Sequence, residues 1–358
     1  MPRYLRNLII ALIVIAALIG LDFVFQGRML NPYFVRILML SGIAITLAVS
    51  LNLINGFTGQ FSIGHAGFMA VGAYSSAYFS VNYGVNLANS LGGGKLGWVV
   101  ALTLSTLIGA AVAGLAGLAV GIPSLRLRGD YLAIVTLGFG QIIVVFLNNI
   151  EAVGGARGYS GIPIVKSFFW IFLVAILTIV IVYNIVNSAF GRALISIRED
   201  ELAAEAMGVN TTRYKVLAFV ISSAMAGAGG VLLAHFAGYL NPKSFEFIKS
   251  FEILIMIILG GLGSIVGSVL GAIVLTVLPE ALRGFAEYRM VIYSLLLIIL
   301  MITRPQGLLG SAAPLKAWRK RAKRAAEAAG GGPAAAPTNP STVATQPERP
   351  APGGENLR

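Results

Sequence analysis

The residue types that most often carry chemistry are scarce in this chain. It has two histidines, His65 and His235, and no cysteine, which excludes disulfides and thiol chemistry. Without a pair of acidic residues inside an apolar segment, neither a metal site nor a nucleophilic triad can be assembled. A phosphate-binding loop requires G-x-x-x-x-G-K-[ST], and the stretch at 92–96, GGGKL, lacks the first glycine and the hydroxyl residue. We therefore expect neither an enzyme nor a cofactor site, and no ATP binding by this chain alone.

Charge is instead concentrated in one segment, residues 191–215, GRALISIREDELAAEAMGVNTTRYK. Four of the 14 carboxylates of the chain fall within seven residues there: Glu199, Asp200, Glu201 and Glu205. They are flanked by Arg192, Arg198, Arg213 and Lys215. The hydrocarbon core of a bilayer does not hold that much charge. The segment is therefore predicted to lie outside the membrane, as a surface on which another protein docks.

Local spacing predicts a short helix in this segment. Ser196 and Glu199 have capping-box spacing, which places the start of a helix at Ser196. Gly208 is placed to end the helix in a left-handed conformation, after about three turns. The face between these caps is mostly small, with Leu202, Ala203, Ala204, Ala206 and Met207. Such a face allows a partner to approach closely, although an ordinary amphipathic helix lying on lipid headgroups has the same pattern.

The elements that must position this segment are membrane spans. The chain is 57% hydrophobic and 11% charged, with 43 glycines among 358 residues, a composition that favours a polytopic membrane protein over a soluble one. Apolar stretches long enough to cross a bilayer lie at 7–25, 33–55, 61–80, 98–121, 131–149, 168–189, 216–238 and 288–303. Another stretch, 251–278, is broken by GGLGS at 260–264. The expected fold is an all-α membrane bundle of about eight crossings plus a broken, re-entrant helix pair.

Orientation follows from the C-terminal tail. From Arg304 onward the chain has nine Lys or Arg against three Glu, which favours a cytoplasmic location. Elsewhere the charges nearly balance, with eight basic residues on the expected inner side and nine on the outer side. We predict a transmembrane domain at 1–310, a basic amphipathic segment at 311–329 that binds membrane lipid, and a disordered tail at 330–358. The alternative for the basic segment is a solvated extension without a partner.

A polar interruption between the second and third spans is the candidate translocation path. Breaks in membrane helices free backbone groups that can line a polar route. The candidate residues are Asn55, Thr58, Gly59, Gln60, Ser62, Gly64 and His65. The alternative is a tight turn in which the glycines serve packing and His65 bonds to a neighbouring helix.

Two ridges of small residues favour helix packing. One ridge has Gly263, Gly267 and Gly271 at four-residue spacing. The other runs from Ala226 to Gly238 in steps of four. Spacing alone leaves open whether these ridges build the internal core or an interface with a second chain.

The chain resembles the permease subunits of bacterial branched-chain amino acid ABC importers, the M-type subunit in particular. The resemblance rests on the charged segment and the helix after it, and on three further motifs in order: LNLINGFTGQFSIGHAGFMAVGAY at 51–74, ILGGLGSIVGSVLGA at 258–272 and RPQGLLG at 304–310. It covers about residues 35–310. In that family the charged loop forms a coupling helix that fits a cleft on a separate ATPase subunit. The resemblance thus implies that Glu199, Asp200, Glu201, Ala204, Glu205, Ala206 and Gly208 contact an ATPase.

The same resemblance implies the partners and the location. Two ATPase subunits, a second homologous permease and an outer amino acid binding protein are expected, with no nucleic acid. The glycine-rich loop at 154–161 resembles the loop on which the family docks the binding protein. The resemblance implies a multi-pass protein of the bacterial inner membrane that imports Leu, Ile and Val by alternating access. Two alternatives remain: a urea or short-amide permease on the same scaffold, and a stand-alone ion-coupled carrier.

Overall fold

A computed structural model describes residues 31–285, except 91, 93, 126, 128 and 166, together with the isolated residues 18, 20, 22, 294, 295, 298, 302 and 307. The expected spans at 7–25 and 288–303 lie almost wholly outside the described residues. The basic segment at 311–329 and the tail at 330–358 lie outside them entirely.

The described part of the chain is helical, which confirms the predicted all-α membrane bundle. The α-helices are α2 (Pro32–Asn52), α3 (His65–Phe79), α4 (Val85–Ser90), α5 (Lys95–Ser124), α6 (Asp130–Asn149), α7 (Phe168–Asn187), α8 (Ala189–Glu199), α9 (Glu201–Ala206), α10 (Thr211–Ala237), α11 (Phe247–Gly260) and α12 (Ile265–Ala281). Short π-helices continue α2 at Leu53–Thr58 and α3 at Ser80–Gly84. Two short strands, β1 (Tyr159–Ser160) and β2 (Tyr239–Leu240), pair antiparallel.

Five described helices are long and apolar enough to cross a membrane. They are Pro32–Thr58, Gly97–Ser124, Tyr131–Asn149, Phe168–Asn187 and Thr211–Ala237, and they match five of the predicted spans. The helix of the span predicted at 61–80 begins only at His65 and continues as a π-helix to Gly84. Residues 59–64 are not helical, so the polar interruption is a real break in the helices. The total number of crossings stays a prediction.

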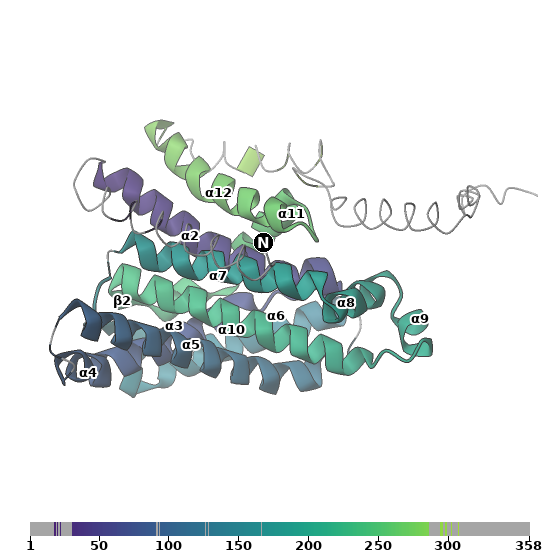
Figure 1. Ribbon diagram of the computed structural model, residues 1–358, viewed down its shortest axis with the longest axis horizontal. Helices are drawn as coiled ribbons and strands as arrows, with labels where there is room; N and C mark the ends of the chain where they lie inside the picture. The colour runs from purple at the N-terminus through teal and green to yellow at the C-terminus, as the bar shows by residue number, and fades with distance from the viewer. Residues whose placement is uncertain are drawn as a thin grey trace, which may run out of the picture. The chain divides into compact units, whose positions relative to one another are not determined.

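Small residues allow the central helices to pack closely. Helix α10 lies against α5, α3 and α2 (Figure 1). A Cβ added at Gly72 of α3 would overlap the backbone of Gly227 in α10, and one at Gly230 would overlap the carbonyl of Met69. Backbones this close leave room for nothing larger than hydrogen. The ridge along α10 therefore serves the internal core.

Helices α11 and α12 form the predicted broken pair. They pack against each other through glycines: a Cβ at Gly267 would overlap the carbonyl of Gly260, and one at Gly271 that of Met256. The turn between the helices contains Gly261 and Gly263, both with positive φ, a conformation that glycine adopts without steric cost. The second ridge of small residues thus also serves an internal contact.

The bundle has two distinct ends (Figure 1). Helices α8 and α9 project at one end, which we call the α9 end. Strand β2 and helix α4 lie at the opposite end, which we call the β end. The charged segment 191–215 includes α9, most of α8 and the first turn of α10, so the fold places it at one end of the bundle.

Candidate functional site

The helix predicted to begin at Ser196 begins instead at Asp200, so that prediction was wrong. The Asp200 carboxylate accepts a hydrogen bond from the Ala203 amide at 3.0 Å and caps α9. Ser196 lies inside α8, where its hydroxyl donates to the carbonyl of Ala193 at 2.8 Å. Helix α9 has six residues, which is fewer than the expected three turns.

The reason for this difference is the amphipathic pattern of α8. Ser188 caps that helix by accepting from the amide of Gly191 at 3.3 Å. Gly191, Leu194 and Ile197 are buried at three-residue spacing, so one face of α8 lies on the bundle and the helix continues past Ser196. Burial of this face outweighs a local cap, which contributes only about 1 kcal/mol.

One face of α9 is anchored to the bundle. The Glu201 carboxylate forms an ion pair with the ammonium of Lys215 in α10, and the Lys215 side chain is only 2% exposed. Ala204 is buried as well. Gly208 follows the helix with a φ of +84°, as predicted, and its amide donates to the carbonyl of Glu205 at 2.9 Å. Helix α9 is thus capped at both ends and anchored through one face.

The other face of α9 points away from the chain. Leu202 is 65% exposed and Met207 is 84% exposed, and Glu205 and Ala206 are exposed beside them. The candidate residues therefore divide into two groups. Asp200, Glu201 and Ala204 build and anchor the helix, whereas Glu199, Glu205, Ala206 and Gly208 remain exposed. Large apolar side chains exposed among carboxylates at the end of a membrane bundle are the pattern of a docking surface.

The polar interruption is closed on itself in this conformation. The Asn55 amide side chain donates to the carbonyl of Ser62 at 3.1 Å and accepts from the Ser62 amide at 3.2 Å. Thr58 donates from its hydroxyl to the carbonyl of Leu53 at 2.8 Å. A 2.8 Å hydrogen bond joins His65 to the hydroxyl of Ser50. Thus Asn55, Thr58, Ser62 and His65 are brought together, buried and satisfied by internal partners.

The remaining candidate path residues lie at the edges of this break. Gln60 is half-buried and Gly59 is exposed. A Cβ at Gly64 would overlap the carbonyl of Thr136 in α6, so this glycine serves packing. The break therefore interrupts the helices, as expected for a polar interruption, and it also packs tightly, as expected for the alternative of a tight turn.

Sequence reasoning missed a junction of three chain segments beside this break. The amide side chain of Asn52, fully buried at the end of α2, accepts from the Gly263 amide at 2.9 Å and donates to the carbonyl of Ser264 at 3.1 Å. Arg198 of α8 donates to the carbonyl of Gly56 at 2.9 Å. We call Asn52, Gly56, Gly59, Gly263 and Ser264 the glycine junction. The only hint in the sequence was that these residues lie in two of the motifs shared with the permease family, at 51–74 and 258–272.

His235 is held by partners inside the bundle. Its Nε2 lies 3.2 Å from the hydroxyl of Ser80, and its Nδ1 lies 3.0 Å from the carbonyl of Pro163. Among the described residues, no group of three or more His, Cys, Asp or Glu side chains is placed to hold a metal ion.

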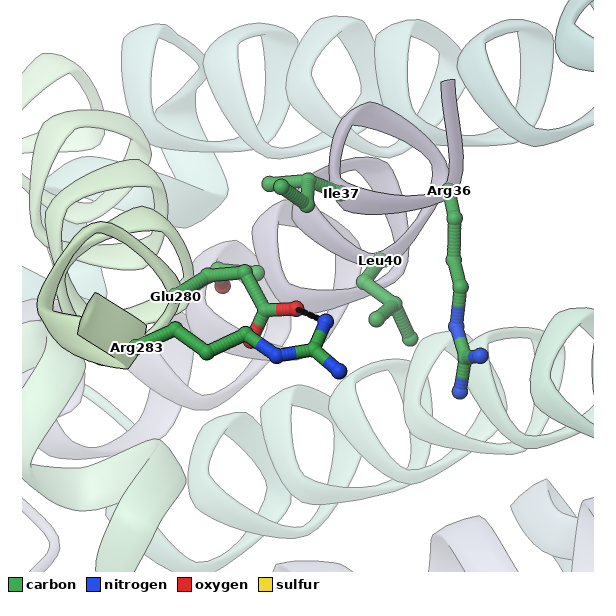
Figure 2. Close-up of a pocket in the computed structure, with 6 residues that line it drawn as sticks. Arg36, Ile37, Leu40, Glu280 and Arg283 are labelled. Atoms are coloured by element: carbon green, nitrogen blue, oxygen red, sulfur yellow. Dashed lines mark ion pairs between the residues drawn. The ribbon is translucent and has the colours of Figure 1, made fainter. Parts of the chain in front are cut away.

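A cavity of about 320 Å³ opens between α2 and α12 at the β end (Figure 2), lined by Arg36, Ile37, Leu40, Thr276, Glu280 and Arg283. Glu280 and Arg283 form an ion pair at 3.6 Å. The Arg283 guanidinium also lies 5.4 Å from the centre of the Tyr33 ring. Glu280 is therefore a paired carboxylate near the end of α12. It differs from the carboxylate relay inside the membrane that an ion-coupled carrier normally uses.

The glycine-rich loop at the β end is ordered by β1 and β2. Tyr159 pairs with Leu240, and the hydroxyl of Tyr239 donates to the carbonyl of Arg157 at 2.8 Å. Gly154, with a φ of +85°, permits the turn before β1. Burial raises the pKa of the Tyr159 phenol, so the phenol is neutral at physiological pH. The loop thus presents a fixed surface at the end opposite α9.

The described residues form a bundle of long apolar helices of the membrane-spanning class, with helix α9 anchored to it and exposed at one end. The comparisons with known proteins give the particular family. The chain belongs to the family described as "Branched-chain amino acid transport system / permease component", which matches residues 33–302.

Individual relatives agree with this membership. The chain is 38% identical over 315 residues to the high-affinity branched-chain amino acid transport system permease protein LivM of Salmonella typhimurium, covering 78% of this chain and 71% of that protein. It is 38% identical over 165 residues to the permease protein LivH of the same organism, covering 44% and 52%. A probable LivM of Methanocaldococcus jannaschii is 23% identical over 317 residues, covering 76% and 92%. No solved structure matches the chain. These relatives are named as transport permeases, in agreement with the expectation of a transporter subunit rather than an enzyme.

Proposed function

We propose that this chain is a transmembrane permease subunit of an ATP-driven importer of the branched-chain amino acids Leu, Ile and Val. The observation that carries the proposal is α9, which is anchored through Glu201 and Ala204 and exposes Leu202 and Met207. The chain has no phosphate-binding loop of its own, so ATP hydrolysis must come from a partner. The family description and the names of the relatives support the class of substrate.

The proposed drive is mechanical. Two ATPase subunits dock at the α9 end, which faces the cytoplasm together with the C-terminal tail, and their closure on ATP moves α9. The chain leads directly from α7 through α8 and α9 into α10. A displacement of α9 therefore reaches two spans and switches the bundle between outward-facing and inward-facing states.

A second permease chain and a binding protein complete the proposed importer in the bacterial inner membrane. The chain is similar both to LivM and to LivH, each named as a permease protein of the high-affinity branched-chain amino acid transport system. This double similarity supports a partner permease homologous to this one. The ordered loop at 154–161 supports docking of an amino acid binding protein at the β end.

The substrate path is proposed to run beside the break at residues 53–64. Asn55, Thr58, Ser62 and His65 are buried there among apolar side chains. These groups can partner an ammonium or a carboxylate once the break opens. The surrounding apolar wall, which includes Phe57 and Phe68, suits an aliphatic side chain.

Purification of the complex tests the docking role. We expect two ATPase subunits to be recovered with the chain from membranes. Glu205→Lys on the exposed face of α9 should abolish their recovery, as should Gly208→Val, which forces a β-branched residue into a left-handed conformation. Glu151→Lys makes the same charge change on an exposed residue of the loop that follows α6 and should leave recovery unchanged.

Uptake into vesicles tests the transport role. Vesicles that contain the whole complex should accumulate labelled leucine with ATP inside, in competition with valine and isoleucine. If urea or a short amide competes with labelled leucine and valine and isoleucine do not, the proposed substrate class is wrong. Leucine uptake by the chain alone in ATP-free vesicles would instead establish a stand-alone carrier and overturn the proposal.

A further inference from the structure

Arg198 joins the docking segment to a part of the bundle that the chain does not connect to it directly. It is the penultimate residue of α8, and its Nη1 donates to the carbonyl of Gly56, 142 residues earlier, at 2.9 Å. Its Nη2 pairs with the Glu199 carboxylate at 2.6 Å. The guanidinium thus spans from α8 to the π-helical end of α2.

Glycines leave room for this side chain. A Cβ at Gly59 would lie 2.6 Å from Cγ of Arg198, and a Cβ at Gly263 would lie 2.9 Å from its Nη1. Both glycines also have positive φ, +72° and +76°, so side chains are disfavoured there for a second reason. Arg198 therefore lies against two glycine turns that belong to different helix breaks.

The side chain of Asn52 connects the break after α2 to the turn between α11 and α12. It holds the amide of Gly263 and the carbonyl of Ser264, which fixes the α11–α12 turn to the end of α2. Gly307 also reaches this place, because a Cβ there would lie 2.5 Å from the Cα of Gly261. The glycine junction is thus a packed unit, and Arg198 is its contact with α8.

We propose that Arg198 is a positioning residue that transmits movement of the docking segment to the glycine junction, and so to α2 and the α11–α12 pair. The inference rests on the proposed function. Chain connectivity carries a movement of α9 only to α7 and α10. Arg198 adds a route to the break that carries the candidate path residues Asn55 and Ser62. A charged side chain that donates a hydrogen bond to a backbone carbonyl transmits displacement better than apolar contacts, because the geometry of that bond is directional.

The test uses the complete complex in vesicles, with three readouts: recovery of the ATPase subunits, ATP hydrolysis, and leucine taken up per ATP. Arg198→Met keeps the length of the side chain and removes its donors. We expect normal ATPase recovery, ATP hydrolysis within about twofold of wild type, and an uptake per ATP about tenfold lower. Arg198→Lys should restore part of the uptake.

Two control variants separate Arg198 from its surroundings. Arg192→Met removes an exposed arginine from the same helix and should leave all three readouts unchanged. Glu199→Gln removes the charge of the second partner of Arg198 and leaves the bond to Gly56; in complexes that retain normal ATPase recovery it should reduce uptake per ATP by less than about threefold. An effect of Arg192→Met equal to that of Arg198→Met would overturn the proposal.

A distance measurement keeps the proposal testable if Arg198→Met does not assemble. Because the chain has no cysteine, spin labels can be attached at Ser196→Cys and Leu262→Cys, two exposed positions on α8 and on the α11–α12 turn. With Arg198 present, the distance between these labels should stay constant when nucleotide is added, since the two elements move together. A distance that changes with nucleotide overturns the proposal.

The outcomes distinguish this inference from the proposed function. If the wild-type complex lacks ATPase subunits or takes up no leucine, the proposed function fails. If the wild type transports and Arg198→Met transports equally well per ATP, only the inference fails. Loss of ATPase recovery in Arg198→Met would show that Arg198 supports the docking surface itself, which also overturns the inference.

Discussion

The ion pair between Glu201 and Lys215 should control how firmly α9 is held. Removing one partner of a fully buried ion pair costs about 3–5 kcal/mol. Here the Lys215 side chain is 2% exposed and that of Glu201 is 23% exposed, so water screens part of the loss. We therefore expect Glu201→Gln to weaken the anchorage of α9 by about 1–3 kcal/mol. At about 1.4 kcal/mol per factor of ten, the helix would be open about 5 to 150 times more often.

Amide hydrogen exchange in lipid nanodiscs measures this opening directly. The amides of Met207, Gly208 and Val209 donate to carbonyls within the α9 segment, so they exchange when the helix opens. Their exchange in Glu201→Gln should accelerate by the same factor of about 5 to 150. Adding Lys215→Met removes the buried ammonium that the first substitution leaves, and exchange should return to within about fivefold of wild type.

A second ion pair provides the matched control. Glu252 and Lys249 form a contact of 2.8 Å in α11, with side chains 41% and 31% exposed. Glu252→Gln should therefore cost less than about 1 kcal/mol and leave exchange in α9 unchanged. The reasoning is refuted if Glu201→Gln affects α9 no more than Glu252→Gln does, or if Lys215→Met makes the opening worse.

Two further substitutions test the packing and the cap. Gly56→Ala should sharply reduce recovery of folded protein, because its Cβ would overlap the side-chain oxygen of Asn52. The control is Gly138→Ala, where a Cβ meets nothing within 4 Å; it should be neutral or stabilising by up to about 1 kcal/mol. Thermal inactivation compares the stability of the two variants with that of the wild type. Asp200→Ala removes the acceptor of the Ala203 amide and should destabilise α9 by about 1 kcal/mol, seen as roughly fivefold faster amide exchange in α9 and nowhere in α6.

The sequence predicted the spans well because hydropathy and length decide where a helix crosses lipid. It predicted the break at 260–264 because clustered glycines are poor helix formers, and Gly261 and Gly263 there do have positive φ. The capping box at Ser196 failed because a cap is a local preference, whereas α8 is fixed by burial of Leu194 and Ile197. Which buried face prevails is a tertiary property that the spacing of Ser196 and Glu199 does not contain.

The candidate site was predictable where it is charged and unpredictable where it is shared between distant segments. Glu205 and Gly208 stand out because charge and a terminal glycine are local signals. Lys215 looked like a flanking surface charge, yet it is buried under α9 and pairs with Glu201. Arg198 and Asn52 act across 142 and 211 residues, and no local pattern reports contacts of that range.

The closed hydrogen bonds of the break have a consequence for selectivity. Asn55 and Ser62 use each other as partners, and His65 uses Ser50. A substrate that contacts these groups must replace bonds that already exist, so it gains affinity only in a conformation in which the break has opened. Substrate binding then favours the conformation in which the break is open, because a ligand shifts the equilibrium between two conformations by its difference in affinity for them. If α9 docks an ATPase and the break contacts substrate, as proposed, both act on the same break, because Arg198 of α8 is bonded to the carbonyl of Gly56.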